Sequence, residues 1–129
     1  MSNGVMMLAL LLMSQVAYAE PISLDSAVKA ILGEAGPSYA ERRAIAFGLH
    51  NRGTLHGVYG RLEAPTEADY QQACRAWFEA QESSLDPVMG ADHWLSDYDL
   101  KHCRPSRTAF RFKMKETAYV GTTHFYKES

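Results

Sequence analysis

The chain has 129 residues, of which 47% are apolar and 22% charged, and its formal net charge is -2. This length predicts one domain, and the composition excludes disordered, collagen-like and low-complexity proteins. The near-neutral charge balance gives no general attraction to nucleic acid. The two cysteines are too few for a scaffold held together mainly by disulfides.

Residues 1–19 have the features of a secretory signal peptide. They contain no Lys, Arg, Asp or Glu, and an apolar run over 5–13 is followed by Ala-Tyr-Ala at 17–19, a typical cleavage site. The run is much shorter than the ~20 residues of a membrane-spanning helix. We therefore expect export to the periplasm or the medium, with one domain over 20–129. An uncleaved anchor at the membrane edge is the alternative.

Export also bears on the two cysteines, Cys74 and Cys103. Thiols oxidise outside the cytoplasm, so we expect a disulfide between these residues. A bridge that closes a loop of about 30 residues stabilises by about 3 to 4 kcal/mol in the chain-entropy account. Two unpaired, buried thiols are the alternative.

The first predicted element of the exported chain is a helix over residues 24–35. Apolar residues recur there at helical spacing, beginning with Leu24, and Ser23 precedes them as a suitable N-cap. Gly36-Pro37 follows and ends the helix.

Two further helices begin at capping-box patterns. Ser38 and Glu41 begin the second helix, which Gly53 ends. Thr66 and Asp69 begin the third in a weaker version of the same pattern, because Asp stands in place of Glu. The expected buried face of the third helix consists of Ala73, Ala76, Trp77 and Ala80.

The character of the sequence changes after residue 84. Proline and glycine indicate an irregular stretch over 86–105. Alternation of apolar and polar residues predicts a half-buried strand over 108–115, and residues 119–126 are predicted to form its hairpin partner. The expected fold class is mainly α (α+β), a single domain of three or more helices with a small carboxy-terminal β-hairpin.

Glu34 is the acid that the helical pattern singles out. It falls in the last turn of the first predicted helix, after Ile31 and Leu32. The negative end of the helix dipole and the apolar neighbours both favour the protonated carboxyl, which a general acid near neutral pH requires. By position alone, an acid in the last turn of a helix is usually a solvated surface group.

Three blocks of the sequence carry motifs. They are residues 31–53 (ILGEAGPSYAERRAIAFGLHNRG), 86–91 (DPVMGA) and 120–126 (VGTTHFY). In this order they resemble the SleB-type cell wall hydrolases, a family related to spore-cortex-lytic enzymes. The resemblance implies a lysozyme-like fold, peptidoglycan as the substrate, and the glutamate of the Gly-Glu-Ala motif as the catalytic acid. That glutamate is Glu34.

The chain departs from the family's pattern in three places. Val88 stands where members often carry Thr, and His93-Trp94 stands where they carry an aromatic residue. The Gln-Phe element common in the family is absent, and residues 57–60 (GVYG) occupy the nearest equivalent stretch. These departures concern the substrate subsites more than the chemistry.

Other residues are candidates for contacts with the substrate, and each type has an ordinary structural alternative. An asparagine at a helix end is often a cap, an aspartate before proline is often a turn residue, and aromatic residues are often core. The spacing of the histidines matches no zinc motif, so we expect neither a metal nor a cofactor. The candidate substrate-binding set is Asn51, Asp86, His93, Trp94, His124 and Tyr126.

The sequence therefore leads to the expectation of an exported peptidoglycan glycosidase. It would cleave the β-1,4 bond between N-acetylmuramic acid and N-acetylglucosamine, either as a muramidase or as a lytic transglycosylase, with Glu34 as the acid. We expect a monomer that binds glycan strands and has no contact with nucleic acid and no stable membrane insertion. The alternatives are a non-catalytic peptidoglycan-binding domain and a metal-dependent wall amidase or peptidase.

Overall fold

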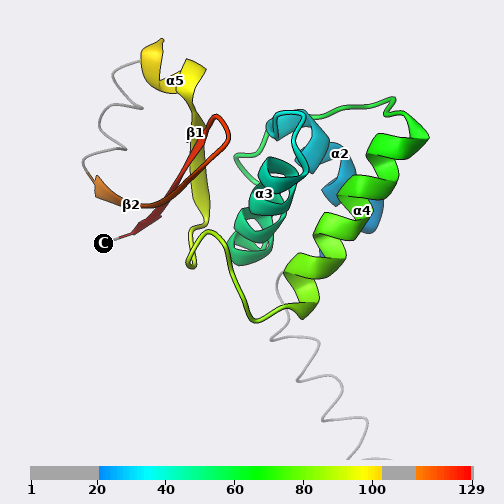
Figure 1. The fold of residues 1–129 in the computed structure, drawn as a ribbon, viewed down its shortest axis with the longest axis horizontal. Helices are drawn as coiled ribbons and strands as arrows, with labels where there is room; N and C mark the ends of the chain where they lie inside the picture. Colours follow the sequence, from blue (N-terminus) through cyan, green and yellow to red (C-terminus); the bar gives the residue numbers. More distant parts are fainter. Residues whose placement is uncertain (1–20, 103–112, 129) are drawn as a thin grey trace, which may run out of the picture.

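The computed structural model describes residues 21–102 and 113–128. These residues form four helices and a three-stranded antiparallel sheet, an α+β arrangement (Figure 1). The predicted signal peptide and most of the predicted strand over 108–115 lie outside the described residues. In chain order the elements are α2 (Leu24–Glu34), α3 (Tyr39–Arg52), α4 (Glu67–Glu82), β1 (His93–Ser96), α5 (Asp97–Lys101), β2 (Met114–Val120) and β3 (Thr123–Glu128).

The predicted N-caps of the first three helices are confirmed. The hydroxyl oxygens of Ser23, Ser38 and Thr66 each accept a hydrogen bond from a backbone N–H in the first turn that follows. At its other end α3 stops at Gly53, whose φ of 74° places it in the left-handed region that favours glycine. Local sequence signals thus determine where these helices begin and where α3 ends.

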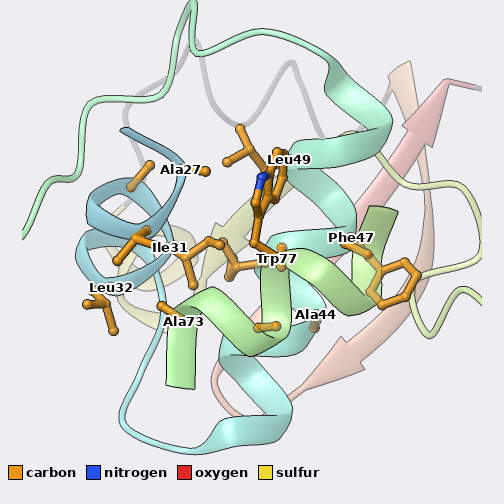
Figure 2. Packing of buried hydrophobic residues seen from close by; sticks show 14 of the residues in the cluster. Ala27, Ile31, Leu32, Ala44, Phe47, Leu49, Ala73 and Trp77 are labelled. Atoms are coloured by element: carbon orange, nitrogen blue, oxygen red, sulfur yellow. The ribbon is translucent and has the colours of Figure 1, made fainter. Parts of the chain in front are cut away.

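The core lies between α2, α3 and α4. The buried residues of α4 are the four that helical spacing predicted, and Figure 2 shows Trp77 among the apolar side chains of α2 and α3. Small residues on α4 allow its backbone to approach its neighbours closely, while Trp77 fills the remaining space. Labelled residues of this core include Ala27, Ile31, Leu32, Ala44, Phe47, Leu49 and Ala73.

The sheet covers the opposite side of α3 from α4 (Figure 1). Its strand order is β1-β3-β2, with both neighbouring pairs antiparallel. Phe125 of β3 is fully buried in the core, and Trp94 of β1, its partner in the register, packs against it. Gly48 of α3 makes room for the indole, because a Cβ there would lie 3.1 Å from the Trp94 ring.

The predicted hairpin exists, but its strands are placed differently. The segment 119–126 was predicted as one strand, whereas it contains the turn between β2 and β3. Gly121 has a φ of 60° and is the first of two turn residues, the position at which a type II′ turn requires positive φ. The aromatic and β-branched residues on both sides of the turn have similar strand propensity, so composition alone does not locate it.

The stretch predicted to be irregular also contains regular structure. β1 forms at its centre because each residue from His93 to Ser96 pairs with a residue of β3. The short helix α5 follows, and Ser96 and Asp99 form a complete capping box at its start. A strand of four residues gives a weak periodic signal, so its existence depends on the distant partner strand.

Glu41 joins the helices to the hairpin. Its side chain is 3% exposed, and Oε1 accepts hydrogen bonds from the Thr122 N–H (3.2 Å), the Thr122 hydroxyl (2.9 Å) and the Thr123 hydroxyl (2.6 Å). Only the Ser38 half of the predicted capping box is present in the hydrogen bonds of the described residues. The carboxylate thus accepts the hydrogen bonds of three donors in and beside the β2–β3 turn. The sequence did not predict this contact between Glu41 and the turn.

Within the described segments, no helix combines the length and apolar character that crossing a membrane requires.

Candidate functional site

A cavity of about 430 Å³ lies where the helices meet the sheet. Its walls come from the end of α2, the end of α3, the loop between α3 and α4, and the β1–α5 segment. Residues from four separate parts of the chain therefore converge on one cavity. The lining residues are Glu34, Arg52, Gly57, Val58, Tyr59, Gly60, His93, Trp94, Leu95 and Asp99.

Glu34 is the last residue of α2, and its half-buried side chain lies in the wall of this cavity. Its Oε1 accepts a hydrogen bond from the Gly60 N–H at 2.9 Å, and its Oε2 accepts a longer, weaker one from the Trp94 indole N–H at 3.4 Å. Two donors from distant elements thus fix the carboxylate in place. Of the two carboxylate oxygens, Oε2 has only the longer, weaker bond.

The backbone of residues 60–62 passes very close to α2. A Cβ on Gly33 would lie 2.5 Å from the Gly60 carbonyl carbon, and a Cβ on Gly60 would lie 2.9 Å from the Gly33 carbonyl oxygen. The Leu62 N–H also donates to the Lys29 carbonyl at 3.0 Å. Glycine at both crossing positions is therefore what allows the Gly60 N–H to reach Glu34.

Gly33→Ala is expected to disturb the site even though alanine is the better helix former. The new methyl group would overlap backbone atoms, so the 60–62 segment must retreat. We expect a loss of about 1 to 3 kcal/mol in unfolding free energy, as in other overpacked sites. Equilibrium urea unfolding measures the effect. Unchanged stability would contradict the proposed role of the close approach.

Arg52 connects the loop between α3 and α4 to the residue that precedes β1. Its guanidinium donates to the His56 carbonyl at 2.7 and 3.1 Å and to the Asp92 carbonyl at 3.1 Å. It is the last residue of α3, so one side chain connects three parts of the cavity wall.

Asp99 brings a second carboxylate to the cavity, together with Glu34. Its Oδ2 accepts a hydrogen bond from the Ser96 N–H at 3.3 Å, which completes the cap of α5. Sequence analysis missed Asp99 because it placed residues 86–105 in an irregular stretch. A Ser-x-x-Asp pattern at 96–99 was the available signal.

Of the candidates from sequence, Glu34, His93 and Trp94 line the cavity. Asn51 and Asp86 are outside its lining and contact each other instead. The Asn51 amide donates to Asp86 Oδ2 at 2.9 Å and to the Ala91 carbonyl at 3.0 Å. Asp86 in turn accepts from two backbone N–H groups of its own loop, at 2.7 and 2.8 Å. The pair braces the 86–91 loop against α3.

His124 and Tyr126 also lie outside the lining of the cavity. Both project from β3 on the face opposite Phe125, because neighbouring residues of a strand alternate between faces. The His124 ring contacts Asp97 at 2.7 Å and Glu116, and the Tyr119 ring stacks on it with a centroid distance of 4.1 Å. Tyr126 is 4% exposed. Neither side chain is therefore part of the cavity wall that holds Glu34.

Asp97→Asn is expected to destabilise the sheet in a pH-dependent way. The Tyr119 hydroxyl and the His124 ring lower the pKa of Asp97 below its ordinary value. A lowered folded pKa gives stability above the unfolded pKa that is lost as the pH falls through the folded value. The variant should therefore melt below wild type near neutral pH, and the gap should close as the pH falls below the ordinary pKa of an aspartate. A gap that stays constant with pH would contradict this assignment.

Cys74 is a free, half-buried thiol on α4, and burial raises its pKa. Its predicted partner, Cys103, lies outside the described residues, so the disulfide stays a prediction.

Within 21–102 and 113–128, no three His, Cys, Asp or Glu side chains form a group that could hold a metal ion. Comparisons with known proteins give no match: no family model matches the chain, and no curated protein or solved structure matches it significantly.

Proposed function

We propose that this protein is an exported peptidoglycan glycosidase with a lysozyme-like fold and Glu34 as its catalytic acid. The observation that carries the proposal is the position of Glu34. Its carboxylate lies in the wall of a cavity of about 430 Å³, held by a backbone N–H and an indole N–H. The Gly-Glu-Ala motif singled out the same residue through its resemblance to the SleB-type hydrolases.

The chemistry begins with a proton transfer. Protonated Glu34 gives its proton to the glycosidic oxygen as the bond to C1 of N-acetylmuramic acid breaks, and the leaving sugar departs as an alcohol. Positive charge develops at C1, and the carbonyl oxygen of the substrate's own N-acetyl group stabilises it. Glu34, now ionised, then takes a proton from the group that attacks C1. That group is water in a muramidase and the C6 hydroxyl of the same sugar in a lytic transglycosylase.

The small number of carboxylates in the cavity lining supports a mechanism that uses the substrate's own N-acetyl group. Of the described residues, only Glu34 and Asp99 bring carboxylates to the cavity lining, and Asp99 caps α5. A two-carboxylate glycosidase requires a second acid about 5 to 9 Å from the first and available to water or to C1. The proposed mechanism therefore assigns catalysis to Glu34 alone.

Digestion of purified sacculi tests the proposal. We expect the exported protein to release muropeptides that carry either reducing muramic ends or 1,6-anhydro ends, which mass spectrometry distinguishes. Sacculus pelleting without muropeptide release would instead support a non-catalytic binding domain. Release of peptides that a chelator abolishes would support a metal-dependent amidase or peptidase. Either of these two results would overturn the proposal.

A further inference from the structure

Tyr59 is the most exposed large hydrophobic side chain among the described residues, at 85%, and yet it lines the cavity beside Glu34. It belongs to the GVYG loop, the stretch where this chain departs from the family that it resembles. An exposed aromatic ring at the mouth of a cavity is a typical feature of a ligand-binding surface.

The backbone around Tyr59 is held on both sides. Val58 is 5% exposed, and its N–H donates to the Leu55 carbonyl at 2.9 Å. On the other side the Gly60 N–H donates to Glu34. A tyrosine has only two side-chain torsions, so a ring mounted on such a loop loses little conformational entropy when a ligand covers it.

Other exposed tyrosines differ from Tyr59 in their surroundings. The Tyr98 ring contacts the His102 ring in a tilted arrangement at a centroid distance of 4.2 Å, and Tyr119 stacks with His124 at 4.1 Å. Within the segments that the structure describes, the Tyr59 side chain has neither a ring contact nor a hydrogen bond. Both faces of its ring are therefore available to a ligand.

We infer that Tyr59 is a stacking platform for a β-1,4-linked N-acetylhexosamine ring bound next to Glu34. The inference rests on the proposed function and deepens it by naming a substrate-binding residue that the sequence did not reveal. Trp94 supplies a second aromatic ring to the same cavity, from β1 on the sheet side. In β-1,4-linked glycans the ring C–H bonds give each sugar an apolar face, and this face packs on aromatic rings.

Binding of a soluble N-acetylglucosamine tetramer, measured by isothermal titration calorimetry, tests the inference. Tyr59→Ala should weaken binding about tenfold, the loss expected for one aromatic contact. Tyr59→Phe keeps the ring and should bind within about twofold of wild type.

Tyr98→Ala is the matched control, because Tyr98 is 70% exposed and lies outside the cavity lining. This substitution should leave binding unchanged. With sacculi, Tyr59→Ala should raise KM more than it lowers kcat.

Equal affinity of wild type and Tyr59→Ala, with both proteins melting at the same temperature, would overturn the inference. So would release of muropeptides by a wild-type protein that does not bind the tetramer. In both cases the proposed function stands, because muropeptide release tests it separately. Wild-type protein that neither binds the tetramer nor releases muropeptides would overturn the inference and the proposed function together.

Discussion

Glu34→Gln is expected to lower the rate of muropeptide release by about three orders of magnitude. The amide has nearly the same shape as the carboxyl but has no proton to give to the glycosidic oxygen. Its carbonyl oxygen still accepts the Gly60 N–H, so the fold and the affinity for glycan should persist. The measurement is the initial rate of release from sacculi, with tetramer binding as the readout of an intact cavity.

Glu82→Gln is the matched control for this change. Glu82 is the last residue of α4, as Glu34 is of α2, but it is exposed and lies outside the cavity lining. It should release muropeptides at the wild-type rate. An active Glu34→Gln variant would refute the catalytic assignment. A variant that is inactive and also melts far below wild type would instead identify Glu34 as a structural carboxylate.

Glu41→Ala is expected to cause the largest loss of stability, about 3 to 4 kcal/mol in the free energy of unfolding. The carboxylate is almost fully buried and accepts three hydrogen bonds from Thr122 and Thr123. Its removal leaves these donors without their acceptor in a place that water reaches poorly. It also opens space between α3 and the hairpin. Equilibrium urea unfolding measures the effect.

Glu41→Gln separates the charge of this residue from its shape. The amide oxygen can still accept from the turn, but the amide N–H₂ group then requires acceptors of its own. We expect an intermediate loss of stability, because bonds to a charged acceptor are stronger than bonds to a neutral one. If both variants unfold like wild type, the link between α3 and the turn contributes nothing measurable.

The elements that the sequence predicts well are those with local signals. The N-caps Ser23, Ser38 and Thr66 and the buried face of α4 depend on residues within a few turns of each other. β1 and the turn at Gly121 escaped prediction for the opposite reason. β1 forms because β3 pairs with it, and strand propensity is similar on both sides of Gly121.

The candidate site also combines residues that local signals identify with residues that only the fold brings together. The helical pattern and the motif identify Glu34, but Gly60 approaches it from 26 positions along the chain and Trp94 from 60. Tyr59, Arg52 and Asp99 line the cavity only because the loop, α3 and the sheet meet there. Asn51 and Asp86 have the right chemistry for substrate contacts, yet the fold uses their polar atoms to brace a loop.

β3 is the central strand of the sheet, although it follows both of its neighbours in the chain. In the described sheet β1 pairs with β3 alone, so the wall that carries Trp94 cannot form during synthesis until residues 123–128 have left the ribosome. A nascent or truncated chain that stops before Thr123 would carry the acid but no finished cleft. Under the proposed function, this order of assembly keeps the glycosidase inactive until β3 has been synthesised.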